Sequence, residues 1–353
     1  MEIKFIPSKN LKEKIQDESQ LGFGQYFTDH MFIMNYQTGK GWHDPRIIPY
    51  QNINLDPSCL TFHYGQTVFE GLKAYRNQDQ ILLFRPDENF KRMNLSSDRL
   101  CIPRFDEELV LRGLKKLIDI ERDWVPHQSD SSLYIRPFVF ADEFFLGVHA
   151  SNSYQFIIIL SPSGPYYSSG LDPVKIYVEE KFVRAVPGGM GEAKTGGNYA
   201  VSLIGQVEAE AKGYSQVLWL DGIERKYIEE VGAMNIFFVI EDKIITPELN
   251  GSILAGITRK SVLELLRNQG ANVEERRISI DEVVTAYQNG KLQEVFGTGT
   301  AAVISPVGEL LYRDQKMIIN DNQIGPVSQK LYDDLTDIQW GRKQGPAGWS
   351  VEV

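Results

Sequence analysis

Cysteine is scarce in this chain, which holds only Cys59 and Cys101 among its 353 residues. Neither lies in a pairing motif, so a disulfide framework is excluded as the basis of the fold. Two buried thiols in a reducing compartment are the simplest interpretation.

Long hydrophobic runs and an excess of positive charge are also missing. The longest apolar run, Phe156–Leu160, is far too short to span a bilayer. The N-terminal residues include acidic side chains and no basic region followed by an apolar stretch, so no targeting segment is expected. The net charge of −10 argues against a nucleic-acid-binding surface. We therefore expect a cytoplasmic protein, complete as printed, that binds neither nucleic acid nor a membrane and needs a locally basic pocket for any small anionic ligand.

The chain is long enough for two domains, and it shows no internal repeat or low-complexity tract. Its 42% hydrophobic and 24% charged residues are ordinary for a globular protein. A stretch rich in proline, glycine and serine, Ser161–Gly170, lies between two apolar strand-like runs and has the composition of a linker. It predicts a small N-terminal α+β domain over 1–165, an interdomain linker over 166–173 and a larger C-terminal domain over 174–353.

Hydrophobic periodicity predicts both helices and strands, and hence a mixed α+β and α/β fold. Strands are expected at 26–35, 133–140, 154–160, 174–178, 216–220, 235–241, 294–296 and 302–304. Helices are expected at 87–99, 107–122, 258–268, 280–288 and 326–338. A further helix is indicated by one apolar stripe, made of Ala200, Leu203, Ile204, Val207 and Ala211 and closed by Gly213 as its C′ residue.

The most informative segment is Pro187–Tyr199, in which five glycines surround one lysine, Lys194. Three interpretations compete: a flexible surface loop with a solvated lysine, a phosphate-binding P-loop, and a loop that presents a nucleophilic amine. The P-loop spacing from Gly188 nearly fits, but Ala193 replaces the glycine that must precede the lysine, and no strand leads into the loop. The P-loop interpretation is therefore weak.

A nucleophilic lysine forms a Schiff base with a cofactor that condenses with amines, and pyridoxal phosphate is the common one. That cofactor also needs an anion site for its phosphate, an acidic residue at its pyridine nitrogen and a donor at its ring oxygen. Glu230 is a candidate acid and Tyr199 a candidate donor. Gly256–Thr258 opens a predicted helix and Gly297–Ala301 is a Gly/Thr turn, and both suit a phosphate. Each signal is weak alone, and their value lies in the combination.

Several segments spread over most of the chain match one family pattern. They are His63–Ala74, Leu83–Pro86 with Arg92 beyond it, Leu133–Pro137, Pro187–Tyr199, Gln216–Leu220, Glu230–Asn235 and Glu294–Ala301. In these segments the chain resembles the branched-chain amino acid aminotransferases, which belong to the fold-type IV class of pyridoxal-phosphate enzymes. The resemblance is to the longer branch of that family, which includes the eukaryotic enzymes.

The resemblance implies a role for each matching residue. The catalytic lysine would be Lys194, and the phosphate would be held by Arg92, Ile257, Thr258 and Thr300. Tyr199 would bond the ring oxygen and Glu230 the ring nitrogen. The substrate pocket would be lined by Tyr64, Phe69, Tyr134, Arg136 and Tyr166, with a backbone N–H at Ala301 for the substrate carboxylate. Judged as residues alone, the aromatic members fit core positions equally well. Ala233 departs from the pattern, because eukaryotic members often have threonine there.

The resemblance also implies an activity and an assembly. The reaction would be transamination between the branched-chain L-amino acids Leu, Ile and Val and 2-oxoglutarate, by a ping-pong mechanism with pyridoxal 5′-phosphate as cofactor. The cofactor would lie between the two domains, and the chain would form a homodimer in which loops of one subunit reach the other's pocket. The alternatives are another type IV enzyme, either a D-amino acid aminotransferase or an aminodeoxychorismate lyase, and more remotely a P-loop nucleotide-binding protein.

Overall fold

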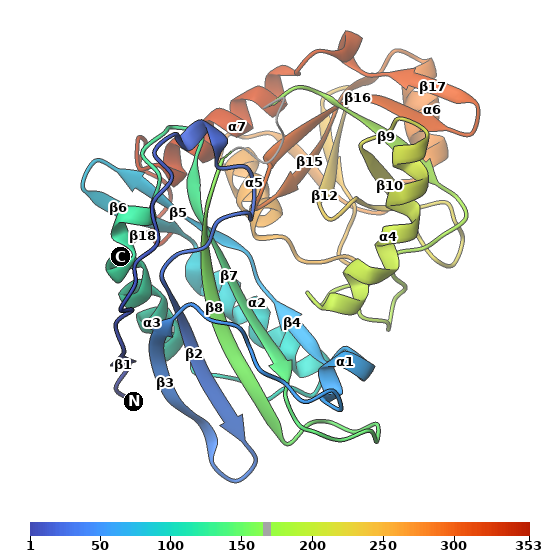
Figure 1. Ribbon diagram of the computed structural model, residues 1–353. Helices are drawn as coiled ribbons and strands as arrows, with labels where there is room; N and C mark the ends of the chain where they lie inside the picture. The colour runs from blue at the N-terminus through green and yellow to red at the C-terminus, as the bar shows by residue number, and fades with distance from the viewer. Residues whose placement is uncertain (165–170) are drawn as a thin grey trace. The chain divides into compact units, whose positions relative to one another are not determined.

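The computed structural model describes residues 1–164 and 171–353, which fall into two compact units (Figure 1). The first unit holds Met1–Tyr166, Ala193–Gly196 and Asp337–Val353, and the second holds Tyr167–Glu192 and Gly197–Thr336. The sequence-based division placed the last two segments of the first unit in the C-terminal domain. Most of the expected linker lies outside the described residues, and the domain boundaries stay a prediction.

The first unit is built on one mixed sheet. Within the described residues its strand order is β1-β3-β2-β8-β7-β5-β6-β18, and β4 pairs with β7. The strands are β1 (Lys4–Phe5), β2 (His30–Gln37), β3 (Gly41–Pro49), β4 (Thr67–Phe69), β5 (Leu72–Asn77), β6 (Gln80–Phe84), β7 (Ser132–Ala141), β8 (Ser153–Ser163) and β18 (Ser350–Glu352). All of these pairs are antiparallel except β1 with β3.

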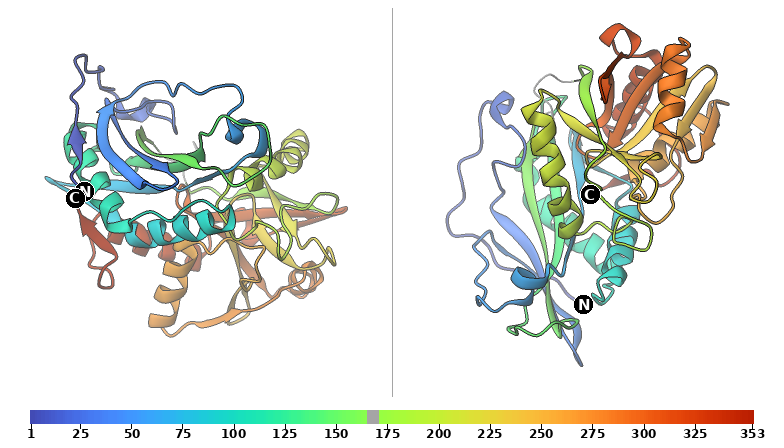
Figure 2. Two further views of the ribbon diagram at one scale, coloured as in Figure 1. Left: turned by 90° about the horizontal axis from the view of Figure 1, so that it is seen from below. Right: turned by 90° about the vertical axis from the view of Figure 1, so that its right-hand side faces the viewer.

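Two helices, α2 (Pro86–Arg99) and α3 (Glu107–Ile120), cover one face of this sheet, as the left view of Figure 2 shows. Helix α3 begins where the Asp106 side chain accepts a hydrogen bond from the Leu109 N–H. Its buried side carries Gly113, where an added Cβ would lie 2.6 Å from a carbon of the Phe32 ring. The helix therefore packs close to β2, and the main core of the unit lies between helices and sheet.

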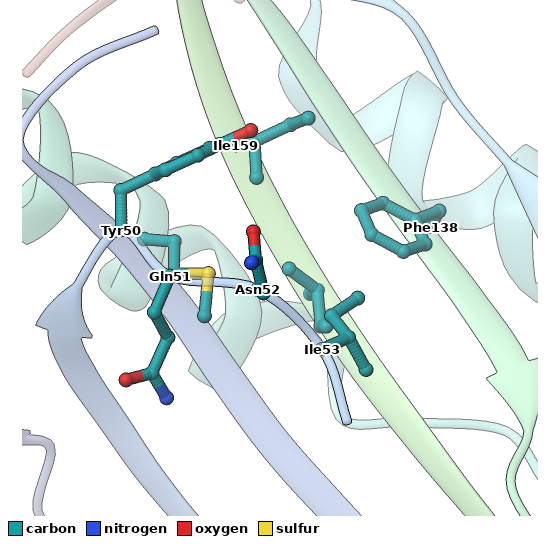
Figure 3. Close-up of a pocket in the computed structure, with 8 residues that line it drawn as sticks. Tyr50, Gln51, Asn52, Ile53, Phe138 and Ile159 are labelled. Atoms are coloured by element: carbon teal, nitrogen blue, oxygen red, sulfur yellow. The ribbon is translucent and has the colours of Figure 1, made fainter. Parts of the chain in front are cut away.

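The opposite face of the same sheet is covered more thinly. A small apolar cluster there joins Met31, Ile33 and Ile157 from neighbouring strands. The segment Tyr50–Ile53 crosses these strands and encloses a cavity of about 240 Å³ against Phe138 (Figure 3). Because side chains alternate along a strand, residues 134, 136, 138 and 140 of β7 all face this side. The short helix α1 (Leu60–Tyr64) precedes β4.

The second unit holds another mixed sheet, with helices packed on it. Within the described residues its order is β11-β10-β9-β16-β15-β12-β13-β14, and β17 pairs with β16. The strands are β9 (Val174–Glu179), β10 (Gln216–Leu220), β11 (Ile228–Val231), β12 (Asn235–Ile240), β13 (Lys243–Thr246), β14 (Asn272–Glu275), β15 (Leu292–Gly299), β16 (Val303–Tyr312) and β17 (Gln315–Ile318). The helices are α4 (Gly196–Ala211), α5 (Ile257–Asn268), α6 (Ile280–Gln288) and α7 (Pro326–Gln339). The mixed α+β and α/β class expected from the sequence is confirmed.

Helix α4 forms where the apolar stripe predicts it, but the stripe points outward. Leu203 is 62% exposed and Val207 is 60% exposed. The buried side of the helix carries Gly205 and Ala209 instead, and an added Cβ at Gly205 would lie 2.6 Å from the Trp219 ring. Periodicity identified the helix correctly, but small residues rather than large ones decide which side packs on the sheet.

Two other expectations need correction. The strand expected at 26–35 begins only at His30, because the preceding residues form turns and irregular backbone. The thiol of Cys59 is buried and donates to the Ala141 carbonyl, whereas Cys101 is exposed rather than buried. Among the described residues, no helix has both the length and the apolar character needed to cross a membrane.

Candidate active site

The backbone of the lysine loop is fixed to strand β4 and helix α2 in the first unit. The Lys194 N–H donates to Ser96 Oγ at 2.9 Å, and the Lys194 carbonyl accepts from the Phe69 N–H at 3.1 Å. Next to them, Thr195 pairs with Val68 as an isolated antiparallel bridge. The loop is therefore an added edge on β4, which excludes the interpretation of a flexible surface loop.

The Lys194 amine lies among predicted substrate-pocket residues. Its Nζ is 4.9 Å from the centre of the Phe69 ring, and the Arg136 guanidinium carbon lies 4.9 Å from the same centre. Both distances are in the range of cation–π contacts. Arg136 also donates to the Tyr134 hydroxyl oxygen at 3.1 Å, since the two residues are neighbours on one face of β7. Four predicted site residues therefore meet in this unit.

A further basic residue in this region, Lys73, was missed by the sequence analysis. It pairs directly with Tyr134 across β5 and β7, so both side chains leave the same face of the sheet. Loss of hydration lowers the pKa of Lys73 to about 8. Its position in the His63–Ala74 segment was the available signal. Together with Arg136, Lys194 and Arg92, it makes this part of an acidic chain locally basic.

Arg92 forms a buried ion pair with Glu70, another residue that sequence reasoning missed. Its Nε and Nη2 donate to the two Glu70 carboxylate oxygens at 2.8 and 2.9 Å, and Asn89 donates to the same carboxylate. Burial alone would raise the pKa of Glu70, but the charges of Arg92 and Lys194 and these hydrogen bonds hold it below its usual value. Arg92 is thus bound to the residue that follows Phe69 in the chain, and its role toward a phosphate stays a prediction.

Two predicted pocket residues do not join this group. Tyr64 on α1 is 42% exposed, and its hydroxyl donates to the Leu146 carbonyl. Tyr166 lies outside the residues that the structure describes.

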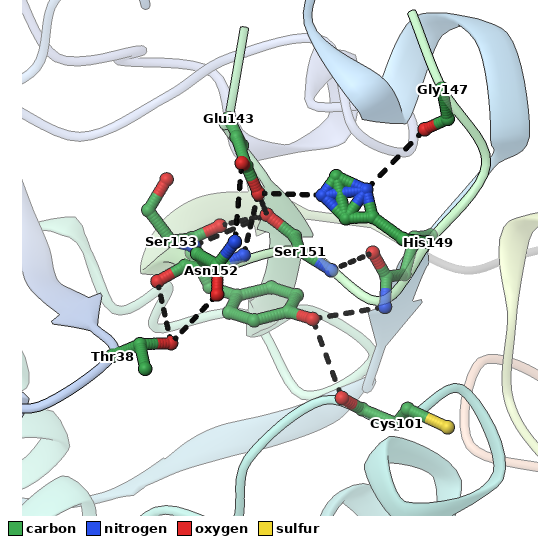
Figure 4. Close-up of polar contacts among 10 residues, drawn as sticks. Thr38, Cys101, Glu143, Gly147, His149, Ser151, Asn152 and Ser153 are labelled. Carbon is green, nitrogen blue, oxygen red and sulfur yellow. Dashed lines mark hydrogen bonds and ion pairs between the residues drawn. The ribbon is translucent and has the colours of Figure 1, made fainter. Parts of the chain in front are cut away.

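The connection between β7 and β8, which receives the Tyr64 hydroxyl, is held by Glu143 (Figure 4). The Glu143 carboxylate accepts from the Asn152 N–H at 2.6 Å and pairs with His149 Nε2 at 3.3 Å. These contacts close a turn whose apolar side chains point to the solvent. They are Phe144, Phe145, Leu146 and Val148, all more than half exposed.

In the second unit, Glu230 on β11 is held by donors from three directions. Arg184 Nη2 lies 2.8 Å from its Oε2, while the Asn235 amide and the Leu254 N–H donate to its Oε1 at 3.2 and 3.3 Å. Glu230 is only 3% exposed and Arg184 only 8%. Such a set of donors favours the ionised carboxylate. Sequence reasoning named Glu230 and missed Arg184, which comes just before the glycine-rich loop.

The N-terminus of helix α5 lies beside the same asparagine. Ile257 and Thr258 form its first turn, and its N-cap, Gly256, supplies no side chain to its backbone N–H groups. An added Cβ at Gly256 would lie 2.0 Å from Asn235 Oδ1, so this position requires glycine. Backbone N–H groups at such a helix end attract anions.

The turn between β15 and β16 completes this second group. Thr300 and Ala301 lie in the turn, and Thr298 just before it pairs with Asn235 across β15 and β12. The Thr298 hydroxyl is buried and has no hydrogen-bond partner among the described residues. Asn235 therefore connects Glu230, the α5 N-terminus and the end of β15. Tyr199 lies in the first turn of α4, and its bond to a ring oxygen stays a prediction.

These two groups define a class of protein when they are compared with known families. A family model described as amino-transferase class IV matches residues 67–310. The matched range includes Lys194, Arg136 and Glu230, so the chain belongs to this family.

Individual relatives narrow the comparison further. Branched-chain-amino-acid aminotransferase 2 of Bacillus subtilis (strain 168) is 60% identical over 343 residues, which are 97% of this chain and 94% of that protein. The crystal structure of Escherichia coli branched-chain amino acid aminotransferase covers 91% of this chain and 98% of its own, with 26% identity and a TM-score of 0.76. The branched-chain amino acid aminotransferase of T.th., solved in complex with N-(5′-phosphopyridoxyl)-L-glutamate, is 28% identical, with a TM-score of 0.72 and coverage of 90% and 97%.

Proposed function

We propose that this chain is a branched-chain-amino-acid transaminase, which moves the amino group between Leu, Ile or Val and 2-oxoglutarate. The observation that carries this assignment is the Lys194 amine, fixed by its backbone beside Phe69 and Arg136. Two relatives that are 60% identical are named for the same activity. The D-amino acid, lyase and P-loop alternatives have no such support.

The cofactor is pyridoxal 5′-phosphate, and the residues present fit it. The chain offers a primary amine at Lys194, a buried guanidinium at Arg92, an ionised acid at Glu230 and a helix start at Gly256 without a side-chain cap. When bound, this cofactor supplies an aldehyde that condenses with primary amines and a protonated ring that accepts electrons.

The remaining cofactor roles follow from that donor set. Arg92, with its guanidinium held by Glu70, would bind the phosphate together with the first-turn residues Ile257 and Thr258 and the turn residue Thr300. The Tyr199 hydroxyl would donate to the ring oxygen. Glu230 would accept from the ring nitrogen, because its other oxygen contacts are already made by Arg184, Asn235 and Leu254.

On the substrate side, Lys194 Nζ takes the proton from the substrate α-carbon and later returns it, acting first as base and then as acid. Phe69 and Tyr134 provide the apolar wall that branched side chains need. Arg136 provides the charge for the side-chain carboxylate of glutamate, and its buried Nε has no partner among the described residues. The backbone N–H of Ala301 would bind the substrate's α-carboxylate. Tyr166 keeps its assigned place in the pocket as a prediction.

We further propose that the enzyme works as a cytoplasmic homodimer. Two exposed apolar surfaces support self-association: the α4 stripe around Leu203 and Val207, and the turn that carries Leu146 and Val148. Exposed apolar surface of this kind marks interaction sites. Tyr64 is bonded to that turn, so we assign it to the pocket of the partner subunit.

A leucine and 2-oxoglutarate assay tests the proposed function directly. We expect Lys194→Ala to lower kcat by about 10²–10⁴-fold or more, because it removes the proton-transferring amine. Lys91→Ala is the matched control, since Lys91 is an exposed lysine that pairs with Asp87 on α2. D-leucine in place of L-leucine checks the stereochemistry. Full activity of Lys194→Ala, or turnover of D-leucine alone, would contradict the assignment.

A further inference from the structure

Two buried carboxylates lie side by side on β11, but only one buried cation serves them. Glu229 is 1% exposed and Glu230 is 3% exposed, and the guanidinium of Arg184 pairs with Glu230. A second ionised carboxylate in this position would bury an uncompensated negative charge, which costs several kcal/mol. The protonation state of Glu229 therefore decides how the Arg184 charge is shared.

The hydrogen bonds around Ser252 fix that protonation state. Ser252 Oγ lies within hydrogen-bond distance of both Glu229 Oε1 and Asn250 Oδ1. A hydroxyl has one proton and donates to one acceptor only. Asn250 Oδ1 also accepts from the Ser252 N–H at 3.1 Å, so this amide presents its oxygen and not its NH₂ group. The Ser252 proton therefore goes to Asn250, and the proton between Ser252 and Glu229 belongs to Glu229.

The surroundings of Glu229 favour the neutral acid as well. Burial raises the pKa of Glu229, and the nearby carboxylate of Asp221 adds to this, while Ser252 and Arg184 only partly oppose it. Glu229 Oε2 is buried and has no hydrogen-bond partner among the described residues. An unpartnered carbonyl oxygen of a neutral acid costs less than an unpartnered carboxylate oxygen.

We propose that Glu229 is a neutral carboxylic acid in the working enzyme and that, together with Ser252, it acts as a positioning residue which leaves the charge of Arg184 to Glu230. The ring nitrogen of the cofactor thereby meets a carboxylate that is fully ionised and held in place. This inference rests on the proposed function, in which Glu230 faces that nitrogen. Arg184 is the third member of the arrangement, because it also donates to the Ser252 carbonyl.

Replacing Glu229 by glutamine tests the protonation state, since a glutamine NH₂ can donate to Ser252 Oγ as the acid does. The cofactor-loaded enzyme is examined without substrate, by infrared difference spectroscopy against Glu229→Gln. We expect the wild type to show the C=O stretch of one neutral carboxylic acid that Glu229→Gln lacks. We also expect Glu229→Gln to keep the unfolding temperature and the cofactor absorption spectrum of the wild type.

The matched control is Glu294→Gln. Glu294 is equally buried, but its carboxylate accepts three hydrogen bonds from Val327 and Ser328, so its replacement should lower the unfolding temperature clearly. A second measurement follows stability with pH. Because the folded pKa of Glu229 is raised, the wild type should lose stability relative to Glu229→Gln as the pH rises above about 4.5.

The outcomes separate clearly. The missing infrared band together with unchanged stability supports the proposal. The absence of such a band in the wild type, or a loss of stability in Glu229→Gln as large as in Glu294→Gln, overturns it. Failure of the proposed function would show differently, as a lack of leucine transamination by the wild type, and it would leave the infrared and unfolding results unaffected.

Discussion

Arg136 is the side chain whose removal should separate the two substrates of the enzyme. Its guanidinium donates to Tyr134 and lies over the Phe69 ring, so it is fixed before any substrate arrives. Leucine has no side-chain charge, whereas glutamate carries a carboxylate that needs a cation. The residue therefore matters more for one half of the reaction than for the other.

For Arg136→Ala we expect kcat/KM for glutamate to fall by roughly 10–100-fold and that for leucine to change much less, because a hydrogen bond to a charged group contributes about 1.5–3 kcal/mol. Steady-state kinetics with each substrate measures this. Arg313→Ala is the control, since Arg313 forms only an exposed ion pair with Glu180. Unchanged glutamate turnover would show that another group binds the carboxylate.

The sequence identified most residues of the candidate site but not the pairs that orient them. Lys194, Arg136 and Glu230 stand in segments whose composition suggests chemistry, so a single chain reveals them. Glu70 and Arg184 act only through Arg92 and Glu230, which are distant in sequence and come close through folding. Nothing in local spacing specifies such partners.

Among helices and strands, periodicity predicted the long regular elements well. Helix α6 has the expected bounds, and α2, α5 and α7 differ by one residue at one end. Strand β3 was missed because Trp42, Asp44, Pro45 and Arg46 interrupt any alternation, and it forms through pairing with β2. Strands that depend on partners in this way cannot be recognised from local pattern.

The packing of α4 gives a prediction about one helix. Gly205 lies against the Trp219 ring, so Gly205→Leu has to displace a fully buried side chain. We expect a loss of about 1–3 kcal/mol in the free energy of unfolding, measured by denaturant titration. Glu208→Gln on the same helix removes only a surface ion pair with Lys181 and should cost less than about 1 kcal/mol. Equal stability of the two variants would contradict this packing.

For the assembled enzyme, the outward apolar stripe of α4 predicts where two copies meet. We expect the double variant Leu203→Glu with Val207→Glu to be monomeric in light scattering, while the wild type is a dimer. Ile223→Glu is the control, because Ile223 is 74% exposed in a turn of the same unit and lies outside the stripe. A dimeric double variant would move the interface elsewhere, and a monomeric wild type would refute the homodimer.

The attachment of the lysine loop to β4 and α2 has a consequence for the time course of folding. The hydrogen bond from Lys194 to Ser96 joins residues 98 positions apart, and closing so long a stretch of chain is entropically costly. Contacts of this separation form slowly compared with helices and hairpins. The reactive amine therefore reaches its place late, after much of the secondary structure exists, and a newly made chain is compact before it is catalytically competent.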